Sequence, residues 1–280
     1  MLVRSMDQLE DEGRVISISH GKASAVRLLT KSDGLNFSLS EARAQKAGQS
    51  NLWYKNHWEA NFVRSGKAVL EDCSTGERWN LEPGVLYCVG PTDKHRIIRE
   101  QDTEMRIISV FNPPIVGEET HDEDGAYPPT GPIPQGKERM FVKSLQDIRD
   151  AGMEVIVGDI ATSRRYLTVA DNLGFSLHSV LLKAGVKADC WYKHHWEGNV
   201  ILDGNMEVTD YATGDVHALG PGGMYLVGPK DRHQIHALTD MLIISVFDPP
   251  LTGTEQRDED GSYPATGPVP KGPMGSGVED

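Results

Sequence analysis

Short β-prone runs alternate with turn-forming residues along most of this chain. In the C-terminal half the runs are 175–182, 198–202, 206–210, 223–227 and 241–247. Gly, Asp and Pro separate them at roughly ten-residue spacing, which is typical of a β-sandwich or a small β-barrel. No GxGxxG, P-loop or GxSxG element stands at a strand-to-helix junction, which disfavours nucleotide-binding and hydrolase α/β folds. The pattern therefore predicts an all-β protein.

The pattern of the first half of the chain returns in the second half. The hexapeptide YKNHWE begins at Tyr54 and reappears as YKHHWE at Tyr192, so the offset is 192 − 54 = 138 residues. The same offset relates Tyr87 to Tyr225 and His95 to His233. A period as long as a domain indicates duplication and fusion of a whole domain rather than a solenoid of small repeats.

Matching openings and endings define the two copies. Residues 1–11 and 140–150 each predict a short strand, a serine helix cap and a short helix, and the endings DEDGAYP and DEDGSYP also correspond. We therefore divide the chain into an N-terminal domain (1–134), a linker (135–139), a C-terminal domain (140–268) and a flexible tail (269–280).

Composition narrows the classes of partner. The net charge of −13 argues against nucleic acid and anionic membrane surfaces as partners. No apolar run approaches the ~20 residues of a membrane span, and the opening residues lack an apolar signal core. Cys73, Cys88 and Cys190 show no C-x-x-C spacing, which disfavours a disulfide framework or a zinc knuckle. We expect a cytoplasmic protein without a membrane partner.

Two blocks in each copy carry the candidate chemistry. In the C-terminal copy, His195 and Glu197 form a His-x-Glu block, and a Pro-Gly turn then leads through Tyr225 to His233. The blocks resemble the two motifs of the cupin family, whose jelly-roll barrel holds a divalent metal. The His-x-His pair of many cupins is missing. Tyr225 is therefore the candidate for the remaining ligand.

The more specific order Tyr-Lys-His-His-aromatic-Glu, then Gly-x-Tyr, then His resembles the ectoine synthase family. Residues 175–178, 250–255 and 258–264 extend this resemblance over nearly all of each copy. It implies a tandem cupin (bicupin) of two jelly-roll β-barrels, each with a short N-terminal helix. A duplicated barrel also implies an intrachain pseudo-dimer, with further homodimerisation left open.

The resemblance implies three metal ligands in each copy. The N-terminal donor set is Glu59, Tyr87 and His95, and the C-terminal donor set is Glu197, Tyr225 and His233. One imidazole and two oxygen donors suit iron(II), with manganese(II) or zinc(II) as alternatives. A strand glutamate or tyrosine can instead be solvent-facing or part of the packing, but retention of all three residue types at one offset favours the metal site.

The resemblance also implies an activity. Ectoine synthase closes N-γ-acetyl-2,4-diaminobutyrate, a small zwitterionic substrate, into a cyclic amidine with loss of water, as an osmoprotectant-forming hydro-lyase. The implied catalytic residues are Tyr192, His195 and Glu255 with Tyr54, His57 and Glu119. The implied substrate-binding residues are Arg165, His178 and Phe247 with Arg27 and Phe111.

Departures from the family pattern leave the substrate and the native metal open. Ala161, Val180 and Ser245 stand where the family has Trp, Thr and Cys, and Arg257 replaces a His that the first copy keeps as His121. The second copy is closer to the family overall and is the preferred active site. Two alternatives remain, namely a metal-dependent cupin oxygenase or lyase on another small carboxylate, and a non-catalytic solute-binding bicupin.

Overall fold

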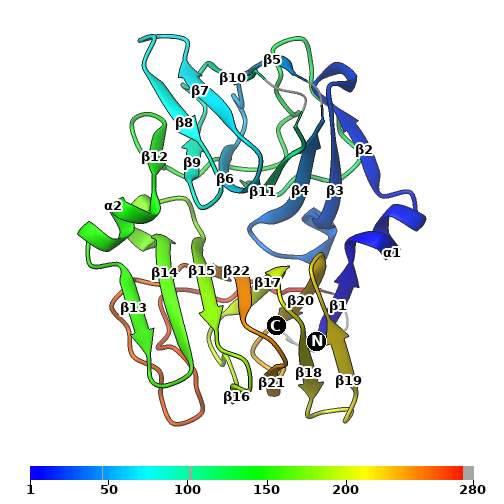
Figure 1. Cartoon of the computed structure of the whole chain (residues 1–280), viewed down its shortest axis with the longest axis vertical. Coiled ribbons are helices and arrows are strands. Elements are labelled where there is room, and N and C mark those ends of the chain that lie inside the picture. Colours follow the sequence, from blue (N-terminus) through cyan, green and yellow to red (C-terminus); the bar gives the residue numbers. More distant parts are fainter. Residues whose placement is uncertain (46, 101–102, 274–280) are drawn as a thin grey trace. The chain divides into compact units, whose positions relative to one another are not determined.

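The computed structural model describes residues 1–45, 47–100 and 103–273, and the regular secondary structure in these ranges is mostly β-strand (Figure 1). The two α-helices are short, α1 (Met6–Asp11) and α2 (Leu145–Asp150). Each follows the predicted serine cap: the Gln8 amide donates to Ser5 Oγ over 3.1 Å, and the Asp147 amide donates to Ser144 Oγ over 3.2 Å. The predicted all-β class is confirmed.

The chain divides into two compact units. The first, which we call the N-terminal barrel, comprises Leu9–Ser32 and Asn36–Asp147. The second, the C-terminal barrel, comprises Met1–Gln8, Asp33–Leu35 and the chain from Ile148 onward. These boundaries differ from the predicted division at 134 and 140, because the opening segment of each sequence copy belongs to the unit built from the other copy. Of the predicted tail 269–280, residues 274–280 lie outside the described ranges.

The N-terminal barrel consists of two antiparallel sheets. The seven-stranded sheet has the order β12-β9-β6-β11-β4-β3-β2 and the four-stranded sheet the order β5-β10-β7-β8. Their bounds are β2 (Val15–Ile18), β3 (Ala23–Leu29), β4 (Ser38–Ala44), β5 (Gly48–Leu52), β6 (Trp58–Ser65), β7 (Ala68–Asp72), β8 (Arg78–Leu81), β9 (Leu86–Val89), β10 (His95–Arg99), β11 (Met105–Asn112) and β12 (Phe141–Lys143).

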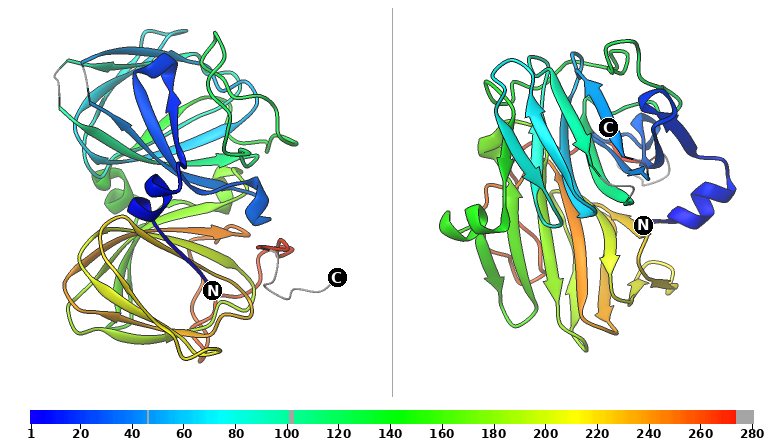
Figure 2. Two further views of the ribbon diagram at one scale, coloured as in Figure 1. Left: turned by 90° about the vertical axis from the view of Figure 1, so that its right-hand side faces the viewer. Right: turned by 45° about the horizontal axis from the view of Figure 1, so that its top comes forward.

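The C-terminal barrel repeats this arrangement element by element. Its sheets have the orders β1-β20-β17-β22-β15-β14-β13 and β16-β21-β18-β19. Their bounds are β1 (Leu2–Ser5), β13 (Glu154–Val157), β14 (Ala161–Leu167), β15 (Ser176–Leu182), β16 (Lys187–Cys190), β17 (Trp196–Asp203), β18 (Met206–Asp210), β19 (Val216–Leu219), β20 (Gly223–Val227), β21 (His233–Ala237) and β22 (Met241–Asp248). In each barrel the strands curve around an interior (Figure 2). The predicted pair of barrels is confirmed.

The opening strand of each sequence copy lies beside the tyrosine-bearing strand of the other copy. In the C-terminal barrel β1 pairs with β20, and Val3 lies opposite Tyr225. In the N-terminal barrel β12 pairs with β9, and Val142 lies opposite Tyr87. This exchange explains why the compact units and the sequence copies have different boundaries.

A buried ion cluster distinguishes the N-terminal barrel. Glu41 on β4 is fully buried, and its carboxylate accepts hydrogen bonds from Arg43 (2.6 Å), Arg64 (2.6 Å) and Arg106 (2.9 Å). Burial alone raises the pKa of Glu41, but the hydrogen bonds from Arg106 and Arg43 outweigh it and hold the pKa below its ordinary value. Ser179 occupies the equivalent position on β15 (41 + 138 = 179), so this cluster is not a shared feature of the fold.

We predict that Glu41→Gln lowers the free energy of unfolding by about 3 kcal/mol at neutral pH, because it leaves three arginines without their carboxylate. Since the folded-state pKa of Glu41 is depressed, its contribution is present above the unfolded value and is lost as the pH falls through the folded value. The difference in unfolding free energy between Glu41→Gln and the wild type should therefore become smaller at acidic pH. Urea denaturation followed by circular dichroism measures both effects.

The matched control is Glu154→Gln. Glu154 pairs with Arg164 (2.7 Å) and Arg149 (3.1 Å) near the surface, where an ion pair contributes less than about 1 kcal/mol. Equal losses in the two variants would show that the buried cluster has no special weight.

Candidate active site

Each barrel encloses a cavity lined by the candidate residues. The N-terminal cavity has a volume of about 70 Å³ and the C-terminal cavity about 40 Å³. The chemistry-bearing side chains that line the N-terminal cavity include Arg27, Tyr54, Glu59, Tyr87, Phe111, His121 and Tyr127. Those that line the C-terminal cavity include His178, Tyr192, Glu197, Tyr225, His233, Phe247, Arg257 and Tyr263.

Strand register brings the glutamate and the tyrosine of each donor set together. In the N-terminal barrel β6 pairs with β9 so that Asn61 lies opposite Tyr87. Residues two apart on a strand face the same side, so Glu59 and Asn61 both project inward beside Tyr87. In the C-terminal barrel the same register holds for β17 and β20. The first two donors therefore come from neighbouring strands of one sheet.

The histidine of each donor set comes from the four-stranded sheet. His95 is the first residue of β10, and its Nδ1 lies 3.0 Å from the backbone oxygen of Asp93. His233 on β21 repeats this contact with Asp231 at 2.9 Å. A carbonyl oxygen can only accept, so Nδ1 carries the proton and Nε2 keeps its lone pair. A backbone or carboxylate partner on one ring nitrogen commonly orients a histidine that binds metal through the other.

The first ring nitrogen is thus fixed, while the second is available. Nε2 of His95 is buried and has no hydrogen-bond partner among the described residues. Burial lowers the pKa of His95 to about 4, so the ring is neutral at physiological pH. A buried nitrogen lone pair without a partner is costly unless a proton donor or a cation approaches it.

The two oxygen donors also lie in a setting that a cation would stabilise. Burial raises the pKa of Glu59 to about 7, and it does the same for Glu197. Burial, followed by the charge of the neighbouring glutamate, raises the pKa of Tyr87 and Tyr225 well above the usual value. The described residues contain no cluster of three His, Cys, Asp or Glu side chains suited to a metal. A metal site here therefore depends on the tyrosine as its third donor.

Hydrogen bonds behind the donors fix the glutamate side of each cavity. Ser109 Oγ donates to Asn61 Oδ1 over 2.6 Å, and Ser245 Oγ donates to Asn199 Oδ1 over 2.5 Å. Sequence reasoning missed the two asparagines, although both keep the 138-residue offset and lie two residues beyond a predicted ligand. Alternation along the strand was the signal that could have found them.

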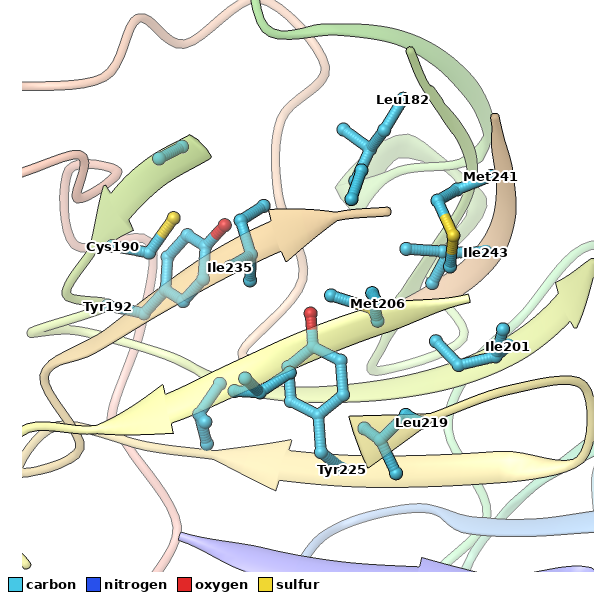
Figure 3. Close-up of a cluster of buried hydrophobic side chains, with 14 of the residues drawn as sticks. Leu182, Cys190, Tyr192, Ile201, Met206, Leu219, Tyr225, Ile235, Met241 and Ile243 are labelled. Carbon is cyan, nitrogen blue, oxygen red and sulfur yellow. The ribbon is translucent and has the colours of Figure 1, made fainter. Parts of the chain in front are cut away.

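Tyr54 and Tyr192 lie in the cavities as predicted side-chain contacts. The Tyr54 ring centroid is 5.9 Å from that of His95, and the Tyr192 ring centroid is 6.2 Å from that of His233. Figure 3 shows the hydroxyl groups of Tyr192 and Tyr225 directed toward the interior of the C-terminal barrel. The ring of the same motif tyrosine thus lies near the donor histidine in each barrel.

Four of the predicted catalytic residues lie elsewhere. His57 and His195 directly precede their strands and do not line the cavities. Nε2 of His57 lies 3.2 Å from Thr130 Oγ1, and Nε2 of His195 lies 3.1 Å from Thr266 Oγ1. The carboxylates of Glu119 and Glu255 accept backbone amides of their own loops, at Val116 (2.5 Å) and Gly253 (2.8 Å). These carboxylates order their own loop turns and do not line the two cavities, and Glu255 Oε1 is buried without a hydrogen-bond partner among the described residues.

Four of the five predicted substrate-binding residues line a cavity. Arg27, Phe111, His178 and Phe247 line the cavities. Arg165 does not line the C-terminal cavity, and its Nη1 donates to the Gly253 backbone oxygen. His121 and Arg257, which the sequence comparison noted as a departure between the copies, also line the cavities, and sequence reasoning missed Tyr127 and Tyr263 among the further lining residues.

Comparison with known proteins gives the family. The sequence model of the ectoine synthase family matches residues 1–131 and again residues 140–267. The chain belongs to the ectoine synthase family. The L-ectoine synthase of Oceanobacillus iheyensis is 44% identical over 125 residues, which are 97% of that protein and 45% of this chain. The L-ectoine synthase of Sphingopyxis alaskensis is 42% identical over 135 residues, which are 98% of that protein and 48% of this chain.

Solved structures support the two-barrel fold of this family member. An oxalate decarboxylase from Lactobacillus farciminis, in a formate complex, aligns with a TM-score of 0.63 over 90% of this chain and 87% of that chain, at 13% identity. A salicylate 1,2-dioxygenase from Pseudoaminobacter salicylatoxidans aligns with a TM-score of 0.62 over 88% and 81%, at 14% identity. At these identities the likeness concerns the fold alone. In the described ranges no helix combines the length and hydropathy of a membrane span.

His178 provides a test of the cavity's polarity. Burial, together with Arg165 and Arg257, lowers its pKa to about 3. The unfolded chain therefore takes up a proton below about pH 6.5 that the folded chain does not, and stability falls. We predict that His178→Ser, which installs the residue found at Ser40, reduces the loss of unfolding free energy between pH 7 and pH 5 by about 2 kcal/mol. Urea titrations at both pH values measure this, and an unchanged pH dependence would contradict it.

Proposed function

We propose that this protein is a metal-dependent cyclase of the ectoine synthase type. It closes an N-acetylated diamino acid, N-γ-acetyl-2,4-diaminobutyrate or a relative, into a cyclic amidine with loss of water. The observation that carries the proposal is the buried Glu, Tyr and His of each donor set in a member of this family. Glu197, Tyr225 and His233 all line the C-terminal cavity, whereas Glu59 and Tyr87 line the N-terminal cavity and His95 lies beside the Tyr54 ring without lining it. The unpartnered Nε2 of His95 and the buried carboxylate of Glu59 fit a bound cation.

The donor sets indicate the class of metal. The Glu and Tyr oxygens with one imidazole nitrogen would hold iron(II), or manganese(II) or zinc(II) in its place. When bound, the metal supplies Lewis-acid polarisation of the acetamide oxygen. The remaining tasks fall to the chain's own residues, which bind the substrate, bring its two ends together and move protons.

The proton balance of the reaction defines one of these tasks. A carbon–nitrogen bond forms between the α-nitrogen and the acetamide carbon, and the carbon–oxygen bond breaks. Two protons pass from the α-ammonium nitrogen to the oxygen that leaves as water. A residue that returns a proton to this oxygen must therefore be protonated at neutral pH and lie in the cavity.

Tyr54 meets both conditions in the N-terminal barrel. Burial, followed by the charge of Glu59, raises the pKa of Tyr54 well above its usual value, so the hydroxyl keeps its proton. The Ser19 amide donates to Nδ1 of His121 over 3.1 Å, so the ring proton of this histidine is on Nε2. Nε2 lies 3.1 Å from the Tyr54 hydroxyl, which therefore accepts from His121 and can direct its own proton to the substrate.

The corresponding hydroxyl in the C-terminal barrel is that of Tyr192. Arg257 Nη2 donates to it over 2.7 Å, so this hydroxyl also accepts a hydrogen bond and keeps its proton for a cavity ligand. Its pKa is raised well above the usual value, mainly by burial. The proton-donor arrangement is thus common to both barrels, although the group behind the tyrosine differs.

Arg27 and Phe111 would position the substrate in the N-terminal cavity. The Arg27 guanidinium donates to Tyr127 OH (3.1 Å) and Ser40 Oγ (3.3 Å), while its buried Nε has no partner among the described residues. This donor suits the substrate carboxylate. Phe111 supplies an apolar wall, and a folded substrate held between these groups gains from proximity of its reacting ends.

We predict that the double variant Glu59→Ala/Glu197→Ala lowers turnover of N-γ-acetyl-2,4-diaminobutyrate by more than about 100-fold, because it removes an oxygen donor from both sites. Iron-loaded protein is incubated with the substrate without oxygen, and the product is followed by NMR. The control is Glu207→Ala on β18, whose partly exposed side chain is near His236, and it should keep wild-type turnover. Unchanged turnover in the double variant, or consumption of oxygen by the wild type, would favour another reaction class.

We also predict that Tyr54→Phe/Tyr192→Phe lowers kcat by about 100-fold with a smaller change in KM, because it removes a proton donor and keeps the rings. Tyr211→Phe is the matched control, since Tyr211 is exposed and its hydroxyl donates to Asp189 at the surface. A loss confined to KM would assign the two hydroxyls to substrate binding instead.

A further inference from the structure

The N-terminal cavity extends along the strands, away from its donor set. Phe111, near the end of β11, lies opposite Glu59 on β6. Met105, the first residue of β11, lies opposite Ala44 on β4. All four residues line the cavity. We call the part of the cavity beside Ala44 and Met105 its far end, because the glutamate of the donor set lies at the other end of β11.

Arg99 brings a guanidinium group to the far end. On β10 the side chains of His95, Ile97 and Arg99 are buried, and the two residues between them are partly exposed. This alternation directs the three buried side chains to the barrel interior. Four residues of strand separate the Cα atoms of His95 and Arg99 by about 14 Å. Arg99 is 5% exposed and lines the cavity, so its side chain belongs to the interior rather than to the surface.

The lining of this cavity carries more positive than negative charge. Among the described lining residues, three have guanidinium groups, Arg27, Arg43 and Arg99, and one has a carboxyl group, Glu59. Arg43 donates to two glutamates outside the lining, each over 2.6 Å, which offset its charge. Arg27 donates to two hydroxyl groups and one backbone oxygen, all of them neutral. This excess of guanidinium groups favours an anionic ligand.

The equivalent end of the C-terminal barrel is apolar. The offset of 138 residues relates Arg99 to Ala237, which is 0% exposed. Ala237 belongs to one buried hydrophobic cluster with Leu182 and Met241, which lie opposite each other on β15 and β22 (Figure 3). The same frame therefore closes this end with apolar side chains. Because a guanidinium group is costly to remove from water, the needs of the fold do not explain an arginine here.

We propose that the far end of the N-terminal cavity is a subsite for a second carboxylate. The substrate of this barrel is then an N-acylated diamino acid whose acyl group itself ends in a carboxylate. Its α-carboxylate binds Arg27, its amide lies at the donor set, and its acyl carboxylate binds Arg99. A guanidinium group suits this task, because it can donate two parallel hydrogen bonds to one carboxylate.

The inference rests on the proposed function and deepens it by naming the substrate class. The bonds that form and break are those of the acetyl compound, since one carbon–nitrogen bond forms, the amide carbon–oxygen bond breaks and water leaves. The acyl carboxylate takes no part in these steps. It contributes binding alone.

Isothermal calorimetry on the metal-free full-length chain tests the subsite without turnover. The probes are N-γ-malonyl- and N-γ-succinyl-2,4-diaminobutyrate, and N-γ-butyryl-2,4-diaminobutyrate is the neutral comparison. At least one acidic compound should bind one site per chain about tenfold or more tightly than the butyryl compound, because it adds a charge-assisted hydrogen bond inside the barrel. Equal affinities for the three compounds would overturn the inference, as would no binding of either acidic compound.

Variants at one strand position separate Arg99 from the rest of the barrel. Arg99→Met and Arg99→Gln remove the charge and should abolish the preference for the acidic compounds, whereas Arg99→Lys should retain part of it. The matched control is Arg96→Met, because Arg96 lies on the outward face of the same strand and donates to Glu71 over 2.7 Å. This control should keep the wild-type preference. Circular dichroism and thermal unfolding identify the folded variants.

The outcomes distinguish this inference from the proposed function. A preference for the acidic compounds that persists in folded Arg99→Gln would overturn the subsite. Turnover of the acetyl compound, together with equal binding of all three probes, would also overturn the subsite and leave the cyclase intact. If the acidic compounds bind through Arg99 but iron-loaded protein cyclises no acylated diaminobutyrate, the binding site stands and the proposed reaction does not.

Discussion

The central constraint in this protein is the burial of a carboxylate inside each β-barrel. An ionised carboxylate is costly to remove from water unless hydrogen bonds or a positive charge compensate for it. Glu59 and Glu197 are each about 5% exposed, and burial raises the pKa of both to about 7. Polar side chains therefore surround each buried carboxylate. An asparagine held by a serine lies beside each glutamate, and a histidine with a free Nε2 is supplied by the opposite sheet in the N-terminal barrel.

The same strand register in both barrels places the glutamate, the asparagine and the tyrosine side by side. β6 and β9, like β17 and β20, pair so that the inward asparagine lies opposite the tyrosine. A one-residue slip of β6 or β17 would turn its glutamate and asparagine together to the opposite face, away from the tyrosine on the neighbouring strand. The exchanged strands β1 and β12 lie directly beside the tyrosine strands, at Tyr225 and Tyr87. Each sequence copy therefore supplies the edge strand that backs the other copy's tyrosine.

Local patterns predicted the parts of the fold that depend on neighbouring residues. The runs 206–210 and 223–227 coincide with β18 and β20, and the serine caps of both helices are present. The exchange of opening strands was not predictable, because alternation reveals a strand but not its distant partner. The burial of Glu41 was likewise not predictable, since two of the three arginines that surround it, Arg64 and Arg106, are 23 and 65 residues away in the sequence.

The candidate site was also only partly predictable from the local sequence. The resemblance to the family implied the glutamate, tyrosine and histidine of each copy, and the 138-residue offset supported them. Glu119 and Glu255 were placed in the site by resemblance alone, yet their carboxylates accept amides of their own loops. A loop glutamate that can satisfy nearby backbone donors does so at little entropic cost, and sequence spacing does not reveal this competition.

Sequence similarity to the family counts every position equally, although a change of charge inside a cavity affects its neighbours more than a neutral substitution does. The sequence comparison favoured the second copy, but its cavity contains Arg257 where the first has His121. Both side chains satisfy the tyrosine hydroxyl behind the site, so packing and hydrogen bonding tolerate the exchange. The exchange places a guanidinium, which stays protonated, where the first copy has an imidazole that accepts the Ser19 amide at Nδ1. A duplicated protein can thus keep the same hydrogen bond behind each tyrosine while the residue type that makes it changes.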